Sequence, residues 1–186
     1  MHNLKPITAL GGTEPRIDRI GGLTVTEVPA IAIASVATRL GGEKATAAAL
    51  KKIIGAPLPG PGKTAGKAPM LAIWSGPDQW MVIAPLPEHE LMAETIADAV
   101  KGKAAVTEQS GAWVQFDVEG AAVLDFFERL CALPVRKMQA GDGERTRIEH
   151  LNAMVICHGA RFSILGAGSS AGSLHHALVT AARSVA

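Results

Sequence analysis

The stretch Leu71–Pro85, LAIWSGPDQWMVIAP, decides how the fold is interpreted. Two short apolar runs flank the turn-forming residues Ser-Gly-Pro-Asp-Gln, and each run carries a tryptophan beside the turn. This pattern predicts a β-hairpin. Because Pro77 cannot adopt the positive φ that a two-residue turn needs at its first position, we expect a four-residue loop. A loop with an even number of residues places Trp74 and Trp80 on opposite faces of the hairpin.

Outward from the hairpin, hydrophobic periodicity and helix-end signals predict alternating strands and helices. The elements expected upstream and just downstream are strands at 23–28, 30–38 and 105–107 and helices at 43–54 and about 87–100. The elements expected further on are strands at 112–118, 145–151, 153–158 and 161–165 and helices at 121–133 and about 169–184. Ser169 and Ser170 are expected to cap the last helix.

This order predicts an α+β fold made of two βαββα(β)-like halves that form one pseudo-symmetric domain. The halves are expected at about 23–109 and 110–186, and residues 1–22 are expected to be a flexible tail, because they show no periodicity. Residues 55–69 contain four prolines and four glycines. Such a composition cannot continue a helix and predicts a mobile connection.

The composition excludes several classes of protein. The formal net charge is +1 and basic residues are scattered, so nothing predicts binding to nucleic acid or to a membrane. Runs such as AIAIASVA are strand-sized, the N-terminus lacks the pattern of a secretory signal, and two distant cysteines suit reduced thiols, so we expect a cytoplasmic protein. Only 19% of residues are charged and 48% are hydrophobic, which favours burial against another subunit.

Two glycine-rich motifs resemble nucleotide sites but lack the required context. PLPGPGKT, residues 57–64, has proline where a phosphate-binding loop needs its first glycine, and it follows a predicted helix in place of a strand. GAGSSA, residues 166–171, lies between a strand and a helix, but the chain ends too soon for a dinucleotide fold. We interpret it as a glycine turn that lets the helix start close to its strand; a nucleotide-binding module remains an alternative.

Neither the histidines nor the carboxylates have the spacing of a metal or acid–base site. His175 and His176 are adjacent on a predicted helix, and Asp117 cannot be paired with another carboxylate from spacing alone. Ser110 is interpreted as a turn residue. We therefore assign no catalytic, cofactor-binding or metal-binding residue to this chain.

Taken together, several stretches resemble the gamma subunits of heterotetrameric sarcosine oxidases. The stretches that carry the resemblance are LTVTEVPAIAIASVATR, AIWSGPDQWMVI, AVTEQSGAWVQFDVEG, RTRIEHLNAMVI and SSAGSLHHALVTAA, which cover most of residues 23–182. The tryptophan hairpin and the SLHHAL segment are the more specific of these. Glu108 departs from the pattern, in which aspartate is expected.

The resemblance implies a non-catalytic structural subunit that assembles with alpha, beta and delta subunits. Such complexes demethylate sarcosine oxidatively to glycine, produce hydrogen peroxide and transfer a one-carbon unit to tetrahydrofolate. It also implies that FAD, FMN, NAD, tetrahydrofolate and zinc are held by the other subunits, and that the fold is similar to folate-binding aminomethyltransferase domains. The alternative is a stand-alone folate-binding or aminomethyltransferase-like one-carbon protein.

The hairpin is the candidate interface with a partner, formed by Trp74, Pro77, Asp78 and Trp80. A tryptophan that is exposed in the lone chain and covered by another subunit is a typical interface anchor. We expect one of the two tryptophans to be substantially exposed. Full burial of both within the chain would exclude this role.

Overall fold

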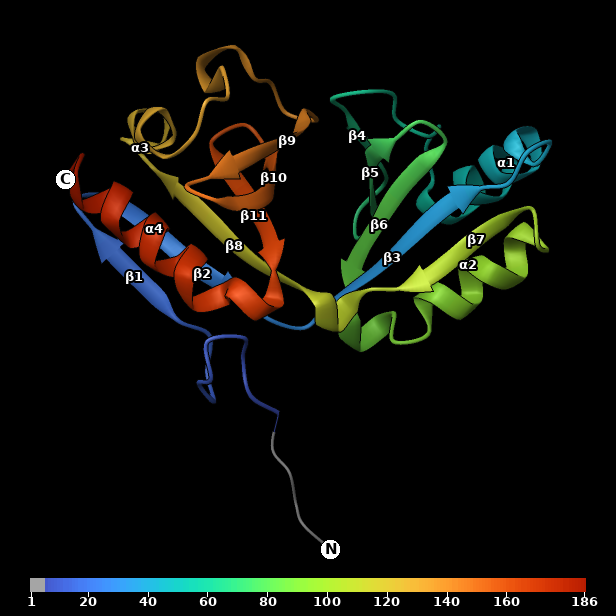
Figure 1. The fold of residues 1–186 in the computed structure, drawn as a ribbon, viewed down its shortest axis with the longest axis horizontal. Coiled ribbons are helices and arrows are strands. Elements are labelled where there is room, and N and C mark those ends of the chain that lie inside the picture. Colours follow the sequence, from blue (N-terminus) through green and yellow to red (C-terminus); the bar gives the residue numbers. More distant parts are fainter. Residues whose placement is uncertain (1–5) are drawn as a thin grey trace, which may run out of the picture. The chain divides into compact units, whose positions relative to one another are not determined.

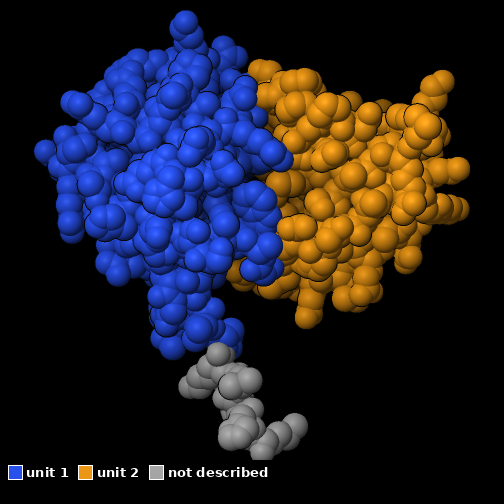
Figure 2. Space-filling view, viewed as in Figure 1, with its two compact units in different colours: residues 1–29, 111–186 blue, residues 30–110 orange. Residues whose placement is uncertain are grey.

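The computed structural model describes residues 6–186 as two compact units. The described part of unit 1 combines residues 6–29 with 111–186, and unit 2 comprises residues 30–110 (Figures 1 and 2). Each unit is an antiparallel sheet with two α-helices on one face (Figure 1). The α+β class with two similar halves is therefore confirmed.

Unit 2 contains a five-stranded sheet in the order β4-β5-β6-β3-β7. Its strands are β3 (Ile31–Thr38), β4 (Thr64–Ala65), β5 (Leu71–Gly76), β6 (Gln79–Pro85) and β7 (Ala104–Glu108), and its helices are α1 (Glu43–Ile54) and α2 (Met92–Val100). Helix α1 has the predicted bounds, because Glu43 opens it, Lys51 and Lys52 lie in its last turn, and Gly55 ends it with a φ of 71°. Helix α2 begins later than predicted, since a 3₁₀ turn occupies Leu86–Glu88.

Unit 1 contains a six-stranded sheet in the order β1-β2-β8-β11-β10-β9. Its strands are β1 (Ile17–Ile20), β2 (Leu23–Val28), β8 (Trp113–Gly120), β9 (Gly143–Ile148), β10 (Leu151–Cys157) and β11 (Arg161–Ala167), and its helices are α3 (Val123–Leu130) and α4 (Ala171–Arg183). Short 3₁₀ turns lie at Ser110–Ala112, Val135–Lys137 and Gly168–Ser170. Ser170 occupies the position before α4, but its side chain makes no capping hydrogen bond, so the predicted cap is wrong.

The two sheets share one topology. In unit 2 the central strand β3 lies between β7 and β6, with β5 and β4 beyond, and in unit 1 β8 lies between β2 and β11, with β10 and β9 beyond. Unit 1 differs in having the additional edge strand β1 beside β2, and in the origin of the flanking strand. In unit 2 the flanking strand β7 follows the second helix, whereas in unit 1 the flanking strand β2 comes from the N-terminal segment.

This topology corrects two sequence predictions. Residues 23–28 were expected in the first half, but β2 pairs with β8 of the other half. The predicted 1–22 tail is also too long, because β1 pairs with β2 and the backbone N–H groups of Leu10 and Arg16 donate to the buried Glu27 carboxylate. Residues 1–5 lie outside the described part of the chain. The arrangement of both halves as one pseudo-symmetric domain stays a prediction.

The connection between α1 and β5 is also more ordered than predicted. It contains strand β4, and Lys67 N–H donates to the carbonyl of Ile54 at 2.7 Å. Leu58 packs against the core of unit 2. The segment is a loop, as its composition indicates, but these contacts tie it to the unit.

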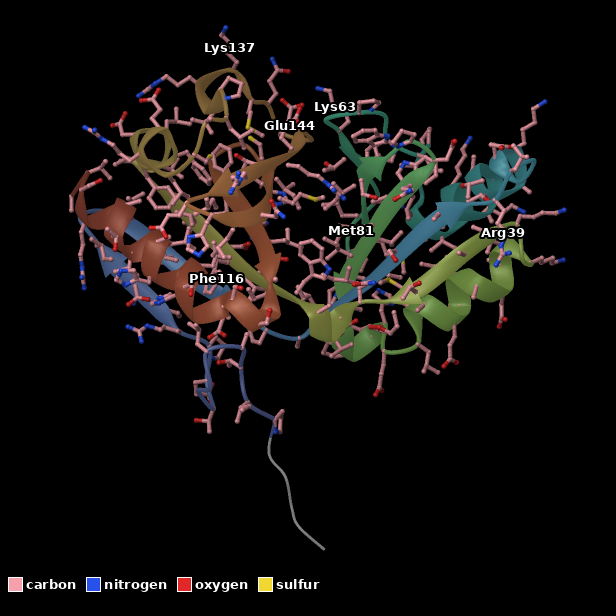
Figure 3. All side chains as sticks on the ribbon, viewed as in Figure 1. Arg39, Lys63, Met81, Phe116, Lys137 and Glu144 are labelled. Carbon is pink, nitrogen blue, oxygen red and sulfur yellow. The ribbon has the colours of Figure 1, made fainter. Side chains whose placement is uncertain are left out.

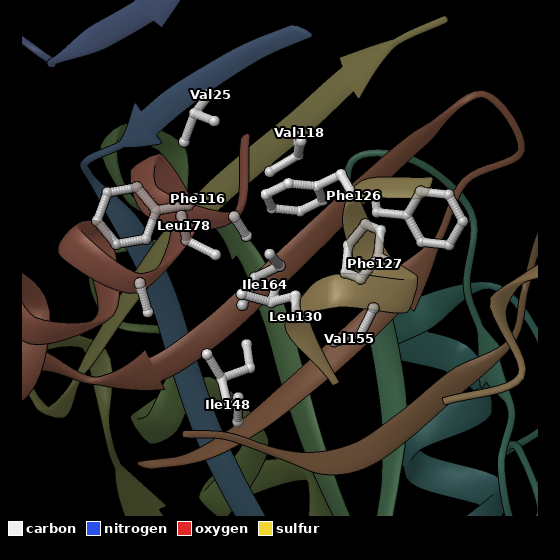
Figure 4. Close-up of a cluster of buried hydrophobic side chains, with 14 of the residues drawn as sticks. Val25, Phe116, Val118, Phe126, Phe127, Leu130, Ile148, Val155, Ile164 and Leu178 are labelled. Carbon is white, nitrogen blue, oxygen red and sulfur yellow. The ribbon is translucent and has the colours of Figure 1, made fainter. Parts of the chain in front are cut away.

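The two cores differ in their chemistry. In unit 2, aliphatic side chains of α1 and α2, such as Leu50 and Ile96, pack on Ala34 and Val82 of the sheet. In unit 1, all four phenylalanines of the chain belong to the core cluster that also includes side chains of α3 and α4. Figure 4 labels three of them, Phe116, Phe126 and Phe127. The phenylalanines are Phe116, Phe126, Phe127 and Phe162, each at most 1% exposed. Figure 3 shows Phe116 in the region of the sheet that α4 covers. Its ring centroid lies 5.8 Å from that of His175 in α4.

Candidate functional site

The tryptophan hairpin forms as predicted, but its loop and register differ from the prediction. Gly76 pairs with Gln79, so only Pro77 and Asp78 connect the strands, and a bulge at Ser75 shifts the register. Trp74 consequently pairs directly with Trp80. Side chains of directly paired residues lie on the same face of a sheet, so the expectation of opposite faces is wrong.

Two local features explain this turn. The positive φ falls on Asp78, at 55°, and not on Pro77. Aspartate tolerates this conformation, so proline at the first position does not prevent a two-residue connection. The bulge then adds one residue to one strand, which reverses the parity that a regular two-residue hairpin would give.

The two tryptophans have different surroundings. The Trp80 indole N–H donates to the carbonyl of Pro59 at 2.9 Å, and its ring packs against the core of unit 2. Among the described residues, that packing does not include Trp74. Both side chains are half-buried, so the expectation that one of them is substantially exposed is wrong, while Pro77 and Asp78 are exposed at the tip. Trp80 therefore supports the fold, and Trp74 and the tip remain the part of the predicted interface that a partner can reach.

The glycine turn before α4 serves packing. A Cβ atom on Gly166 would lie 2.6 Å from Cδ2 of Leu174 in α4. The glycine thus allows strand β11 and helix α4 to approach closely. The interpretation of GAGSSA as such a turn is therefore supported. The other glycine-rich motif, PLPGPGKT, follows helix α1 and runs into β4, so it lacks the preceding strand that a phosphate-binding loop needs.

Unit 1 carries a polar network on the face of its sheet opposite α3 and α4. Ser163 Oγ donates to Asp117 Oδ1 at 2.7 Å, and Gln115 Nε2 donates to the same oxygen at 2.8 Å. Arg161 pairs with Asp117 Oδ2 at 3.1 Å, and His158 Nε2 lies 2.9 Å from Ser163 Oγ. The partial burial of His158, together with the nearby Arg161 charge, lowers the pKa of its imidazole.

The order of these contacts determines what the network can do. In a nucleophilic triad the histidine lies between the serine and the carboxylate and takes the proton of the serine. Here Ser163 lies between them, and its hydroxyl donates to Asp117 Oδ1. His158 then donates to the serine oxygen and cannot act as its base. The network satisfies the buried Ser163 hydroxyl and joins β8 to β11.

Sequence reasoning missed this network, although a signal for it exists. Gln115 and Asp117 alternate with the buried Val114, Phe116 and Val118, which places two polar side chains on the second face of a central strand. The partners Ser163 and His158 come from distant positions that only the strand register brings close.

A second charged cluster attaches β1 to α4. His175 Nε2 lies 2.7 Å from Asp18 Oδ2, and Arg16 Nε lies 3.1 Å from the same oxygen. Burial alone would raise the pKa of Asp18, but the hydrogen bonds from Arg16 and His175 outweigh burial and hold it below its usual value. The adjacent histidines of the sequence thus differ in role, because His175 is half-buried and His176 is exposed.

We expect Asp18→Asn to destabilise the protein at neutral pH and to have a smaller effect in acid. A carboxyl whose pKa is lowered in the folded state contributes stability above its unfolded pKa, and this contribution is lost as the pH falls through the folded value. The difference in Tm between wild type and variant should therefore shrink between pH 5 and about pH 3. Asp98→Asn, on an exposed position of α2, is the control and should show no such trend. A constant difference across this range would contradict the role of the ion pair.

Within residues 6–186, no group of three or more His, Cys, Asp or Glu side chains is arranged to hold a metal ion. None of the helices in this range is long and apolar enough to span a membrane.

The fold is similar to that of two known proteins. A chain of the heterotetrameric sarcosine oxidase from Corynebacterium sp. U-96, solved in complex with pyrrole 2-carboxylate, matches 91% of this chain and 88% of its own length, with 21% identity and a TM-score of 0.79. The glycine cleavage system aminomethyltransferase T from Bartonella henselae matches 84% of this chain with 14% identity and a TM-score of 0.58, but this chain spans only 48% of that protein. No protein-family model and no curated protein matches the sequence.

Proposed function

We propose that this chain is a non-catalytic structural subunit of a heterotetrameric sarcosine oxidase. The observation that carries the proposal is the similarity to a chain of such a complex along nearly the whole length of both chains. The resemblance of the sequence stretches quoted above leads to the same assignment. In this role the chain acts in the cytoplasm, alongside the alpha, beta and delta subunits. FAD, FMN, NAD, tetrahydrofolate and zinc are held by those subunits.

The unit 1 network is consistent with a structural role. Its carboxylate, Asp117, is already engaged by Ser163, Gln115 and Arg161, and the serine proton is committed to it. Groups engaged in this way hold strands together and are not poised to react with a substrate.

Native mass spectrometry of the chain co-expressed with the other three subunits tests this proposal. The expected result is a complex with one copy of each subunit, together with no binding of tetrahydrofolate to the lone chain. If the other three subunits form a complex without this chain, and no binding of this chain to that complex is detected, the proposal is wrong.

The second candidate is a stand-alone folate-binding or aminomethyltransferase-like one-carbon protein. The similarity to aminomethyltransferase T favours it, although this chain spans about half of that protein. Titration of the lone chain with tetrahydrofolate in a calorimeter separates the two candidates. Saturable binding at one site, without any of the partner subunits, would favour the second candidate over the first.

The two tryptophans of the hairpin should respond differently to truncation. Trp74→Ala should weaken assembly at least about tenfold, as expected for an aromatic anchor, with little change in the stability of the lone chain. Trp80→Ala should lower the free energy of unfolding by roughly 2 kcal/mol, because it removes core contacts and the hydrogen bond to Pro59. Urea unfolding and a binding titration against the other subunits measure both effects. Unchanged affinity in Trp74→Ala would remove the hairpin from the interface.

A further inference from the structure

Strand β7 forms an edge of the unit 2 sheet that has no further strand beside it. Among the described residues it pairs only with β3, and it is the last strand in the order β4-β5-β6-β3-β7 (Figure 1). The corresponding strand of unit 1 is β2, which lies beside the central strand β8. That edge is covered, because β1 pairs with β2 through all four of its residues. Unit 2 thus ends in an open edge where unit 1 carries one more antiparallel strand.

Hydrogen bonds at the two ends of β7 show which of its peptide groups face the open edge. Arg39 N–H donates to the carbonyl of Lys103 at 2.9 Å, and Gln109 N–H donates to the carbonyl of Ile33 at 2.8 Å. Along an antiparallel strand, the N–H and C=O of one residue point to the same side, and the side alternates from residue to residue. The odd-numbered residues of β7 therefore bond to β3. The backbone groups that point away from the sheet belong to Ala104, Val106 and Glu108.

The other edge strands carry features that hinder the addition of a strand. Strand β9, GERTRI, has three charged residues, β1, IDRI, has two, and β4 has only two residues in all. Charged and short edge strands are common means by which proteins block unwanted pairing. Strand β7 begins with Ala-Ala-Val-Thr, and the carboxylate of its one charged residue, Glu108, accepts the N–H of Ser110 at 2.8 Å. Residues 104–107 thus have none of these protections.

Basic side chains lie around the beginning of β7. Arg39, Lys101 and Lys103 are all exposed, and no ion pair within residues 6–186 involves any of them. The backbone bond between Arg39 and Lys103 holds the turn after β3 next to the start of β7 (Figure 3 labels Arg39). In an antiparallel pair, the start of one strand lies beside the end of the other. A carboxylate at the C-terminal end of an added strand would therefore meet this positive charge.

We propose that β7 pairs with an extended segment of another subunit, antiparallel to it and in the place that β1 takes in unit 1. This inference rests on the proposed function, since it assumes that partner subunits exist. Main-chain hydrogen bonds supply the affinity of such strand addition, and a carboxylate of the segment beside Lys103 fixes its direction and register. Strand β1 shows that four residues suffice, with Ile20 packed on the core and Asp18 bonded to α4. A second copy of β7 fits less well, because its Glu108 carboxylate is already engaged.

Hydrogen exchange at single-residue resolution tests the proposal on the complex co-expressed with the other three subunits. In the lone chain, the amides of Ala105 and Thr107 should exchange slowly, because they bond to β3, and those of Val106 and Glu108 should exchange fast. In the complex, exchange at Val106 and Glu108 should slow at least about tenfold. Protection of these two amides in the lone chain that rises with its concentration would show that a second copy occupies the edge, and would overturn the proposal.

Val106→Pro removes the central N–H that faces the open edge. Proline is tolerated where the N–H points away from the sheet, so the lone chain should fold, with its Tm lowered by roughly 2–5 °C. Binding to the other three subunits, immobilised together, should weaken about tenfold or more. The matched control is Arg145→Pro on the edge strand β9. Cys157 N–H donates to the carbonyl of Asp142, so by alternation Arg145 N–H also points away from its sheet. This variant should fold and leave binding unchanged.

Lys103→Glu tests the charge at the beginning of β7. Lys103 is exposed, so the variant should fold with an unchanged Tm and bind the three subunits about tenfold more weakly, with the loss reduced at high salt. If the complex forms, but Val106 and Glu108 exchange in it as in the lone chain and both edge variants bind as tightly as the wild type, the edge proposal is wrong and the proposed function stands. If the wild type itself does not bind the subunits, the proposed function is wrong, and the edge proposal fails with it.

Discussion

Replacement of Phe127 by alanine is expected to lower the free energy of unfolding of unit 1 by about 3–5 kcal/mol. Phe127 is fully buried on α3, near Phe126 (Figure 4). Its ring centroid lies 5.1 Å from that of Phe126 and 4.7 Å from that of Phe162. Truncation removes the buried apolar surface of the ring and its contacts with two other aromatic rings, and it leaves a cavity in a closely packed core. The neighbouring rings cannot collapse fully into the space, because both are held by the sheet or the helix.

Urea unfolding followed by circular dichroism measures this loss. Phe127→Leu is the matched control, since it keeps an apolar side chain and should cost roughly 1–1.5 kcal/mol. Leu50→Ala in unit 2 gives a comparison in an aliphatic core, where the expected loss is about 2–4 kcal/mol. A loss below about 1 kcal/mol for Phe127→Ala would mean that the aromatic cluster does not hold unit 1 together.

Local sequence signals predicted the elements of this protein well. Helix α1 was predicted with its observed bounds because an acidic first turn, a basic last turn and a terminal glycine all lie within a few residues of it. The strand predicted at 105–107 lies within β7, and those predicted at 145–151, 153–158 and 161–165 correspond to β9, β10 and β11, although the first runs past the turn at residues 149–150. Each of these signals depends only on neighbours along the chain.

The features that sequence reasoning missed depend on pairing between distant segments. The alternation of β2 predicts a strand but does not say that its partner is β8, more than eighty residues away. Strand β1 has only four residues, and pairing with β2 and a hydrogen bond between Asp18 and His175 of α4 stabilise it. Both assignments require knowledge of the sheet order.

The hairpin site shows how one residue can reverse a prediction. The strands and the turn residues were correct, but the bulge at Ser75 placed both tryptophans on the same face. Nothing in the residues Ser-Gly-Pro-Asp-Gln indicates which strand takes up an extra residue, because the bulge is set by the pairing of the flanking strands. Whether the hairpin meets a partner stays a prediction.

The last prediction concerns Gly120, where β8 ends beside β2. Its φ is +136°, and a Cβ atom there would lie 2.2 Å from the carbonyl oxygen of Gly22 and 2.9 Å from Cα of Leu23. Both contacts are to backbone, so no side-chain rotation can relieve them. Gly120→Ala must therefore displace β2 from β8, which loosens Leu23 and Val25 from the aromatic core.

We expect Gly120→Ala to lower the free energy of unfolding by roughly 3 kcal/mol or more, as the sum of backbone strain and overpacking. Gly22→Ala is the matched control, because Gly22 also has positive φ, at +82°, but a Cβ atom there meets nothing within 4 Å. It should cost about 1 kcal/mol, which is the strain alone. Urea unfolding gives both values, and amide hydrogen exchange along β2 should rise only in Gly120→Ala. Equal losses in the two variants would show that the close approach of β2 to β8 contributes nothing, and that the N-terminal strand is not a structural part of unit 1.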